Sequence, residues 1–273
     1  MKDLTFLLPC RIESEDRLRN VVTSTTYLLK NFPEAKVILK EVDTHSHFKF
    51  RALPVISKYV DTKHLIHIYE QSDEKFFHKT RILNDLLVAS NTEIVYNHDV
   101  DIVLPKSSYI SAYNAISNGN ADVVYPFGCG VYQWAVNYSE STFNQFLDSN
   151  FDFSLLNECK FRVASSIGWG QMIKRDVEIN AGLWNENFIS WGAEDCEFYF
   201  RLNSFGLRVG RVNSDVYHFE HGRTFNSHYH NPKFMDNHNL WQSIRTWDAS
   251  KLKSYYQQQT YIQQRGRELN VSV

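Results

Sequence analysis

Residues 96–105, Tyr-Asn-His-Asp-Val-Asp-Ile-Val-Leu-Pro, hold two acids one residue apart at the end of an apolar run. The run at 94–96 predicts a buried strand, and Pro105 cannot continue a sheet. Asp99 and Asp101 should therefore lie where the strand ends, which is where open α/β sheets bind ligands. Residues two apart in an extended segment point the same way, so a divalent cation could relieve the repulsion between the two carboxylates. Surface turns also carry such pairs, so the rest of the chain must decide.

Segments that predict strands alternate with segments that predict helices in the first part of the chain. We expect strands at residues 4–8, 36–43, 64–69 and 94–96, and helices at 15–31, about 49–59 and about 77–90. Strands that alternate with helices imply a parallel sheet with right-handed crossovers. This pattern is typical of a nucleotide-binding α/β half.

The pattern is less regular after Pro105. A helix over about 107–118 should lead to a strand at 121–126, and the tail from about 232 predicts two helices. Residues 127–166 are aromatic-rich and poorly periodic, which fits either a lid or a packed layer. We therefore expect a single domain at 1–228, made of a nucleotide-binding half (1–105) and a less regular second half (106–228), followed by a helical C-terminal extension (229–273).

Composition excludes several classes of protein. A net charge of −2 and a pI near 6.6 create no field that attracts nucleic acid, so we expect no such partner. The four cysteines are far apart, which fits free thiols in a reducing compartment. No run of about 18 apolar residues exists, and the N-terminus enters a strand at once. We expect a cytoplasmic protein with at most peripheral contact to the inner face of a membrane.

A second informative block is Trp-Gly-Ala-Glu-Asp at residues 191–195. Gly192 allows another group to approach the backbone closely, and Glu194 and Asp195 should open a helix. The helix dipole favours acids at this end, so simple capping is one interpretation of the pair.

Two histidines three residues apart, His218 and His221, could share a metal site with Asp101. A separate zinc cluster with His228 and His230 ranks lower, because zinc sites usually bring cysteines or a tighter ligand spacing.

These blocks together resemble a GT-A-fold inverting glycosyltransferase, nearest to the beta-1,4-galactosyltransferase family and its bacterial relatives. Residues 77–84, Phe-His-Lys-Thr-Arg-Ile-Leu-Asn, are similar to that family's Phe-Asn-Arg-Ala-Lys-Leu-Leu-Asn. Residues 99–101 with Pro105 resemble its Asp-Val-Asp-Leu-Ile-Pro, and residues 191–195 match the core of its Trp-Gly-Gly-Glu-Asp block. The likeness covers roughly residues 4–225, with the blocks in the family's order. It implies an α/β fold with a Rossmann-like, mixed, mostly parallel sheet flanked by helices.

The resemblance implies a metal-dependent transfer of a hexose, of the galactose or N-acetylhexosamine type, from a UDP-sugar to a glycan or lipid-linked glycan. It also implies a role in bacterial surface polysaccharide synthesis. Mn²⁺ or Mg²⁺ would be held by Asp101 and His221, with His218 where the vertebrate enzymes have methionine. Asp99 would face the ribose or the metal's water.

The resemblance also implies roles for the remaining candidate residues. Asp195 would be the catalytic base and Glu194 its partner for the sugars. Uridine would lie near Pro9 and Arg11, and Glu41 or Asp43 would accept the uracil N–H. The other expected donor contacts are Lys79, Arg81, Gly168, Trp191 and Gly192. The chain departs from the family at Ala193, where the family has glycine, and at Cys196 and Glu197, where it has two aspartates.

Two other functions remain open at this point. One is a catalytically silent sugar- or nucleotide-binding protein on the same fold, although the intact Glu194 and Asp195 pair argues against loss of function. The other is a phosphotransferase of the Asp-x-Asp type. Such enzymes generally carry the pair after their first strand, whereas here it follows three earlier strands.

Overall fold

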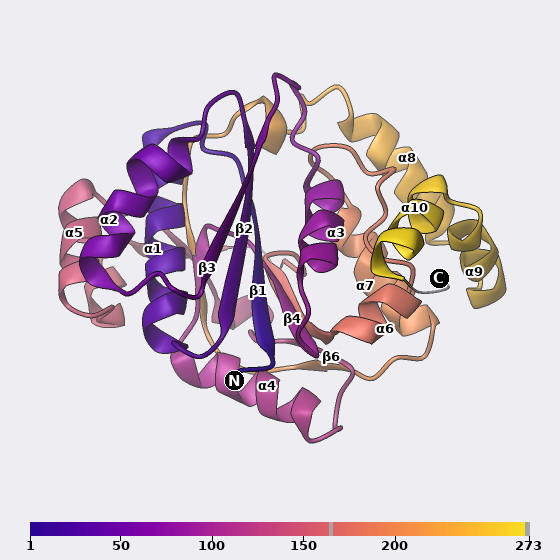
Figure 1. Cartoon of the computed structure of the whole chain (residues 1–273), viewed down its shortest axis with the longest axis horizontal. Coiled ribbons are helices and arrows are strands. Elements are labelled where there is room, and N and C mark those ends of the chain that lie inside the picture. Colours follow the sequence, from indigo (N-terminus) through magenta and orange to yellow (C-terminus); the bar gives the residue numbers. More distant parts are fainter. Residues whose placement is uncertain (164–165, 271–273) are drawn as a thin grey trace.

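A mixed sheet forms the centre of the chain in the computed structural model, which describes residues 1–163 and 166–270. Within these residues the sheet has seven strands in the order β10-β6-β9-β4-β1-β2-β3 (Figure 1). The bounds are β1 (Leu4–Cys10), β2 (Lys36–Asp43), β3 (Leu65–Gln71), β4 (Ile94–His98), β6 (Val123–Tyr125), β9 (Gly170–Lys174) and β10 (Val209–Arg211). Strands β4, β1, β2 and β3 are parallel, and β9 runs antiparallel between β4 and β6. The predicted mixed, mostly parallel sheet is thus confirmed.

Helices cover both faces of this sheet. Their bounds are α1 (Glu15–Asn31), α2 (Leu53–Tyr59, after a π-helical turn at Phe48–Ala52), α3 (Lys79–Ala89), α4 (Lys106–Ser117) and α6 (Arg175–Asn180). The first crossover helix, α1, begins where the Ser14 hydroxyl accepts the Arg17 backbone N–H at 3.3 Å, and Glu15 and Asp16 suit the positive end of its dipole.

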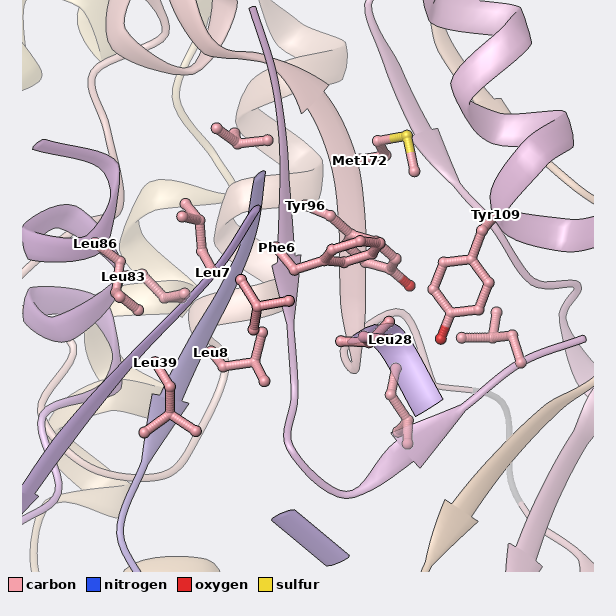
Figure 2. Close-up of a cluster of buried hydrophobic side chains, with 14 of the residues drawn as sticks. Phe6, Leu7, Leu8, Leu28, Leu39, Leu83, Leu86, Tyr96, Tyr109 and Met172 are labelled. Carbon is pink, nitrogen blue, oxygen red and sulfur yellow. The ribbon is translucent and has the colours of Figure 1, made fainter. Parts of the chain in front are cut away.

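The core lies on both sides of β1, whose seven residues are all buried. Figure 2 shows Phe6, Tyr96 and Tyr109 clustered on one side of the sheet, with Leu83 and Leu86 of α3 on the other. The Phe6 ring lies 5.7 Å from the Tyr96 ring and 6.0 Å from the Tyr109 ring, measured between centroids. A continuous apolar strand is what burial on two faces requires.

A second, smaller sheet adjoins the first and contains much of the segment that the sequence left open. Its order is β5-β11-β7-β8, with β5 (Ile102–Val103), β7 (Gln133–Val136), β8 (Lys160–Arg162) and β11 (Val216–Phe219). The segment also contains α5 (Glu140–Asp148) and 3₁₀ turns at Gly130–Tyr132 and Phe153–Leu156. Phe143, Phe146 and Leu156 are buried, as a packed layer requires. Residues 164 and 165 of the predicted segment lie outside the described part.

The C-terminal tail is helical, as expected, but residues 229–270 form three helices instead of two. They are α8 (Phe234–Ile244), α9 (Ala249–Gln257) and α10 (Thr260–Leu269), and they gather near α7 (Glu194–Ser204) on the side away from α1, α2 and α5 (Figure 1). The predicted second helix is broken at Gln258 and Gln259. No helix in the described residues is long and apolar enough to cross a membrane.

Candidate active site

A cavity of about 580 Å³ opens at the carboxyl ends of β1 and β4. Its wall brings together most of the residues that the sequence singled out. They are Pro9, Arg11, Lys79, Asp99, Asp101, Gly168, Trp191, Glu194, Asp195, His218 and His221.

The possible metal ligands form a compact triad. The Asp101 Oδ2 atom lies 3.3 Å from His221 Nε2 and 3.6 Å from His218 Nε2. One ligand atom from each residue lies within 4.8 Å of the other two. Strand pairing creates this arrangement, because β11 lies against β5 and the Phe219 N–H donates to the Asp101 carbonyl at 2.8 Å.

Both histidines present the nitrogen that a metal would need. The Nδ1 atom of His221 lies 3.1 Å from the Gly222 carbonyl, and the Nδ1 atom of His218 lies 3.0 Å from a Glu220 carboxylate oxygen. Because Nδ1–H donates to these oxygens, Nε2 of each ring is directed at Asp101. The other Asp101 oxygen, Oδ1, is buried and has no hydrogen-bond partner among the described residues. This orphaned acceptor fits a site that holds a cation.

The charges of the triad agree with that interpretation. Burial lowers the pKa of His218, but the Asp101 and Glu220 carboxylates outweigh burial and raise it to about 10. Burial raises the pKa of Asp101, whereas the two histidines depress it well below its usual range. A bound divalent cation would replace the protons that otherwise compensate the buried carboxylate.

A tryptophan beside the cavity supports one of these histidines. The Trp169 ring stacks on the His218 imidazole, with centroids 5.3 Å apart and planes 16° from parallel. It stands beside Gly170, where φ is +141° and an added Cβ would lie only 2.4 Å from the Asn97 carbonyl oxygen. Only glycine can occupy such a position without displacing β4.

Across the cavity, one lysine faces three carboxylates. Lys79 Nζ lies 2.9 Å from Asp99 Oδ1, 3.8 Å from Asp195 Oδ1 and 3.9 Å from Glu194 Oε1. Burial raises the pKa of Asp195, Lys79 lowers it, and the carboxylates of Glu194 and Asp99 raise it again. The result is a pKa of about 7. A carboxyl group with such a pKa can gain or lose a proton near neutrality.

The loop that leads into α7 has an unusual backbone. Ser190, Gly192 and Ala193 have φ values of +62°, +128° and +66°. Helix α8 holds this loop, because the Asn237 side chain bonds the backbone of Ile189 and the carbonyl of Trp191. Left-handed backbone at non-glycine residues persists only where its surroundings over-determine it, and it is common at functional sites.

Four of the predicted donor contacts lie away from the cavity wall. Glu41 is fully buried, and its oxygens accept from Ser46 Oγ and the Phe48 N–H and contact His67. Asp43 accepts from the backbone of Ile12 and Thr44, and Arg81 pairs with Glu70 at 2.7 Å. Gly192 packs against the Phe234 ring.

Sequence reasoning missed Asn226, which joins four segments around the cavity. Its Nδ2 donates to Glu13 Oε1 and to the Lys75 carbonyl, and its Oδ1 accepts from the Phe77 N–H and Ser190 Oγ, all between 2.9 and 3.1 Å. Asn226 lies in the short 3₁₀ turn Phe225–Ser227, which is too short to carry a periodic signal, so nothing in the sequence distinguishes it.

Comparison with solved structures shows which fold this is. The chain superposes on GalNAc-T7 with UDP, GalNAc and Mn²⁺ (TM-score 0.62, 13% identity, 98% of this chain and 55% of that one). It also superposes on the S. aureus TarS fragment 1–349 with UDP-GlcNAc (TM-score 0.56, 15% identity, 96% and 72%). A third match is the mannosyltransferase PcManGT of Pyrobaculum calidifontis with GDP-Man and Mn²⁺ (TM-score 0.56, 14% identity, 98% and 72%). The chain has the GT-A fold.

Sequence comparison points the same way for part of this GT-A chain. Residues 157–223 match the family model described as the N-terminal domain of galactosyltransferase. No curated protein matches the sequence. The match spans β9, the whole of α7 and β11 with the residues just after it, so it includes both Asp195 and His221. The chain is thus similar to galactosyltransferases over the segment that holds Asp195 and His221, and to glycosyltransferases in its fold.

Proposed function

We propose that the chain is a metal-dependent, inverting hexosyltransferase that moves a sugar of the galactose or N-acetylhexosamine type from a UDP-sugar to a glycan. The observation that carries the proposal is the pairing, in one cavity, of the triad around Asp101 with a carboxyl group, Asp195, whose pKa is about 7. A metal held by the triad would neutralise the diphosphate that leaves, and Asp195 would take the proton from the hydroxyl that attacks.

Asp101, His218 and His221 would hold the metal. A bound Mn²⁺ or Mg²⁺ acts as a Lewis acid that neutralises charge on a leaving diphosphate. The oxygen and imidazole ligands of the triad suit Mn²⁺ and other borderline cations better than a purely oxygen-selective ion. The partnerless Asp101 Oδ1 atom supports the same assignment.

Asp195 would act as the general base. An inverting transfer needs a group that takes the acceptor proton as the hydroxyl attacks the anomeric carbon from the side opposite UDP. A pKa of about 7 leaves a substantial fraction of Asp195 ionised at neutral pH. Glu194, whose Oε2 accepts the Gly192 N–H at 3.2 Å, would orient the sugar hydroxyls beside it.

The uridine would bind near the end of β1. Arg11 donates from Nε to the Val42 carbonyl at 2.9 Å, and its guanidinium lies 5.5 Å from the centre of the Phe77 ring. This makes a rigid edge of cation and aromatic ring beside Pro9, which suits a planar base. Glu41 is excluded from this role by its burial and its three partners.

Hydrolysis and transfer assays with a panel of UDP-sugars, with Mn²⁺ and with EDTA, test the proposal. Metal-dependent release of UDP supports it. UDP binding without any turnover would favour a silent binding protein, and phosphate release from phosphomonoesters would favour a phosphotransferase. A lipid-linked acceptor, a role in bacterial surface polysaccharide synthesis and a place at the inner face of the membrane remain predictions for the same assay with membrane-derived acceptors.

A further inference from the structure

Lys79 is surrounded by acids instead of lying open to a phosphate. It is the first residue of α3, and its side chain is only 17% exposed. Its ammonium lies 2.9 Å from Asp99 and 3.8 Å from Asp195, so two segments far apart in sequence meet at this one charge. Because these carboxylates already neutralise the ammonium, its attraction for a diphosphate should be weak.

We propose that Lys79 is a positioning residue for the catalytic step: its ammonium holds the Asp195 carboxylate in place and keeps it ionised, so that it can take the acceptor proton. The inference rests on the proposed function, because it requires Asp195 to be the base. It assigns to Lys79 a role on the acceptor side of the reaction, whereas the family resemblance implied a contact with the donor.

The other groups that face Asp195 leave Lys79 to stabilise the ionised form of its carboxyl group. Asp99 follows β4, Glu194 and Cys196 lie on α7 itself, and the buried Tyr125 hydroxyl comes from β6. All of these are acids or neutral groups, and burial opposes ionisation as well. Within the described part of the chain, Lys79 is the cation among them, and an opposite charge at this range lowers a carboxyl pKa by about 1–3 units.

Loss of the ammonium should therefore leave the base protonated at neutral pH. The pH at which kcat/KM reaches half its maximum reports the ionisation of the base in the free enzyme. In Lys79→Met that midpoint should rise by about 1–3 pH units from about 7, so activity at pH 7 falls by roughly 5- to 500-fold and recovers as the pH is raised. The affinity for UDP with Mn²⁺ should stay within about threefold of the wild type.

Two matched variants show whether the positive charge, at this position, sets the midpoint. Lys79→Arg keeps the charge and should keep the wild-type midpoint. Arg81→Met removes a cation from the same helix that pairs with Glu70 outside the cavity, and it should also leave the midpoint unchanged. If Lys79→Met melts far below the wild type, Lys79→Gln supplies a second neutral side chain that can still donate to Asp99.

A measurement that needs no turnover separates this inference from the proposed function. The carboxyl ¹³C signal of Asp195, identified by its loss in Asp195→Asn, can be titrated in wild-type and Lys79→Met protein. Its midpoint should rise in the variant even if the wild type transfers no sugar. An unchanged midpoint, or a tenfold weaker UDP affinity with the kcat/KM profile unmoved, would overturn the proposal and return Lys79 to the diphosphate.

Discussion

Gly168 offers a way to move the Asp195 carboxylate without changing its chemistry. A Cβ added at Gly168 would lie 2.5 Å from Asp195 Oδ2 and 3.1 Å from its Cγ. The φ of Gly168 lies outside the left-handed region, so alanine fits the backbone and only the contact is at fault. The Gly168→Ala variant should therefore fold and displace the carboxylate.

The size of the displacement follows from the contact distance. Ordinary van der Waals contact begins at 3.4 Å, whereas the added Cβ would lie 2.5 Å from Asp195 Oδ2. The carboxylate oxygen must therefore move away by about 0.9 Å. A misplacement of about 1 Å in a reacting group can cost about 100-fold in rate. We expect kcat to fall by roughly 10- to 100-fold. The UDP and metal affinities should be nearly unchanged, because those contacts are expected around Asp101 and Arg11.

Steady-state transfer kinetics, calorimetry with UDP and Mn²⁺, and thermal melting test this expectation together. Gly210→Ala is the matched control, because a Cβ there meets Val124 at an ordinary 3.5 Å and β10 lies away from the cavity. Wild-type kcat in Gly168→Ala, with a normal melting temperature, would show that the position of Asp195 does not limit catalysis and would refute the reasoning.

The remaining predictions concern the metal, the base and the C-terminal helices. Asp101→Ala should abolish the gain in UDP affinity that Mn²⁺ gives in calorimetry, and a gain that persists would remove Asp101 from the site. Asp195→Asn should lower kcat by about two to four orders of magnitude at unchanged UDP affinity, whereas a lower melting temperature with normal turnover would reduce Asp195 to a helix cap. Tyr256→Phe removes the hydroxyl that donates to the buried Glu197 at 2.5 Å, so urea denaturation should show a loss of about 1–3 kcal/mol; no loss would mean that α9 does not stabilise α7 through this bond.

The order of the first elements was predictable because its signals are local. Strand β1 is a buried apolar run, and β4 opens with another at residues 94–96 before it ends at His98 beside the cavity. Strand β9 was not predicted, because Gly-Gln-Met-Ile-Lys at Gly170–Lys174 becomes a strand only through antiparallel pairing with β4 and β6. The two-residue strand β5 depends in the same way on a partner more than a hundred residues away.

The sequence predicts which groups meet only where position along the strands alone decides it. Asp101 and His221 lie together because Asp101 directly precedes β5 and His221 follows β11, which runs antiparallel beside β5. Glu41 also ends a strand at the same edge, yet its oxygens are taken by groups within the next few residues and by His67 on β3. The sequence indicates which edge of the sheet a side chain reaches. It says little about which neighbouring groups form hydrogen bonds with that side chain.

Lys79 and Arg81 show how far this limit extends. Both are basic residues near the start of α3, and the same resemblance associated both with the nucleotide. A helix turns by about 100° per residue, so residues two apart face directions about 200° apart. One therefore faces the cavity and its carboxylates, and the other faces Glu70 on the edge strand. Which of the two faces the cavity depends on how α3 is rotated against β1 and β2, which packing sets. The pH profile of the Lys79 and Arg81 variants is thus also a test of that packing, since a helix rotated by half a turn would exchange their phenotypes.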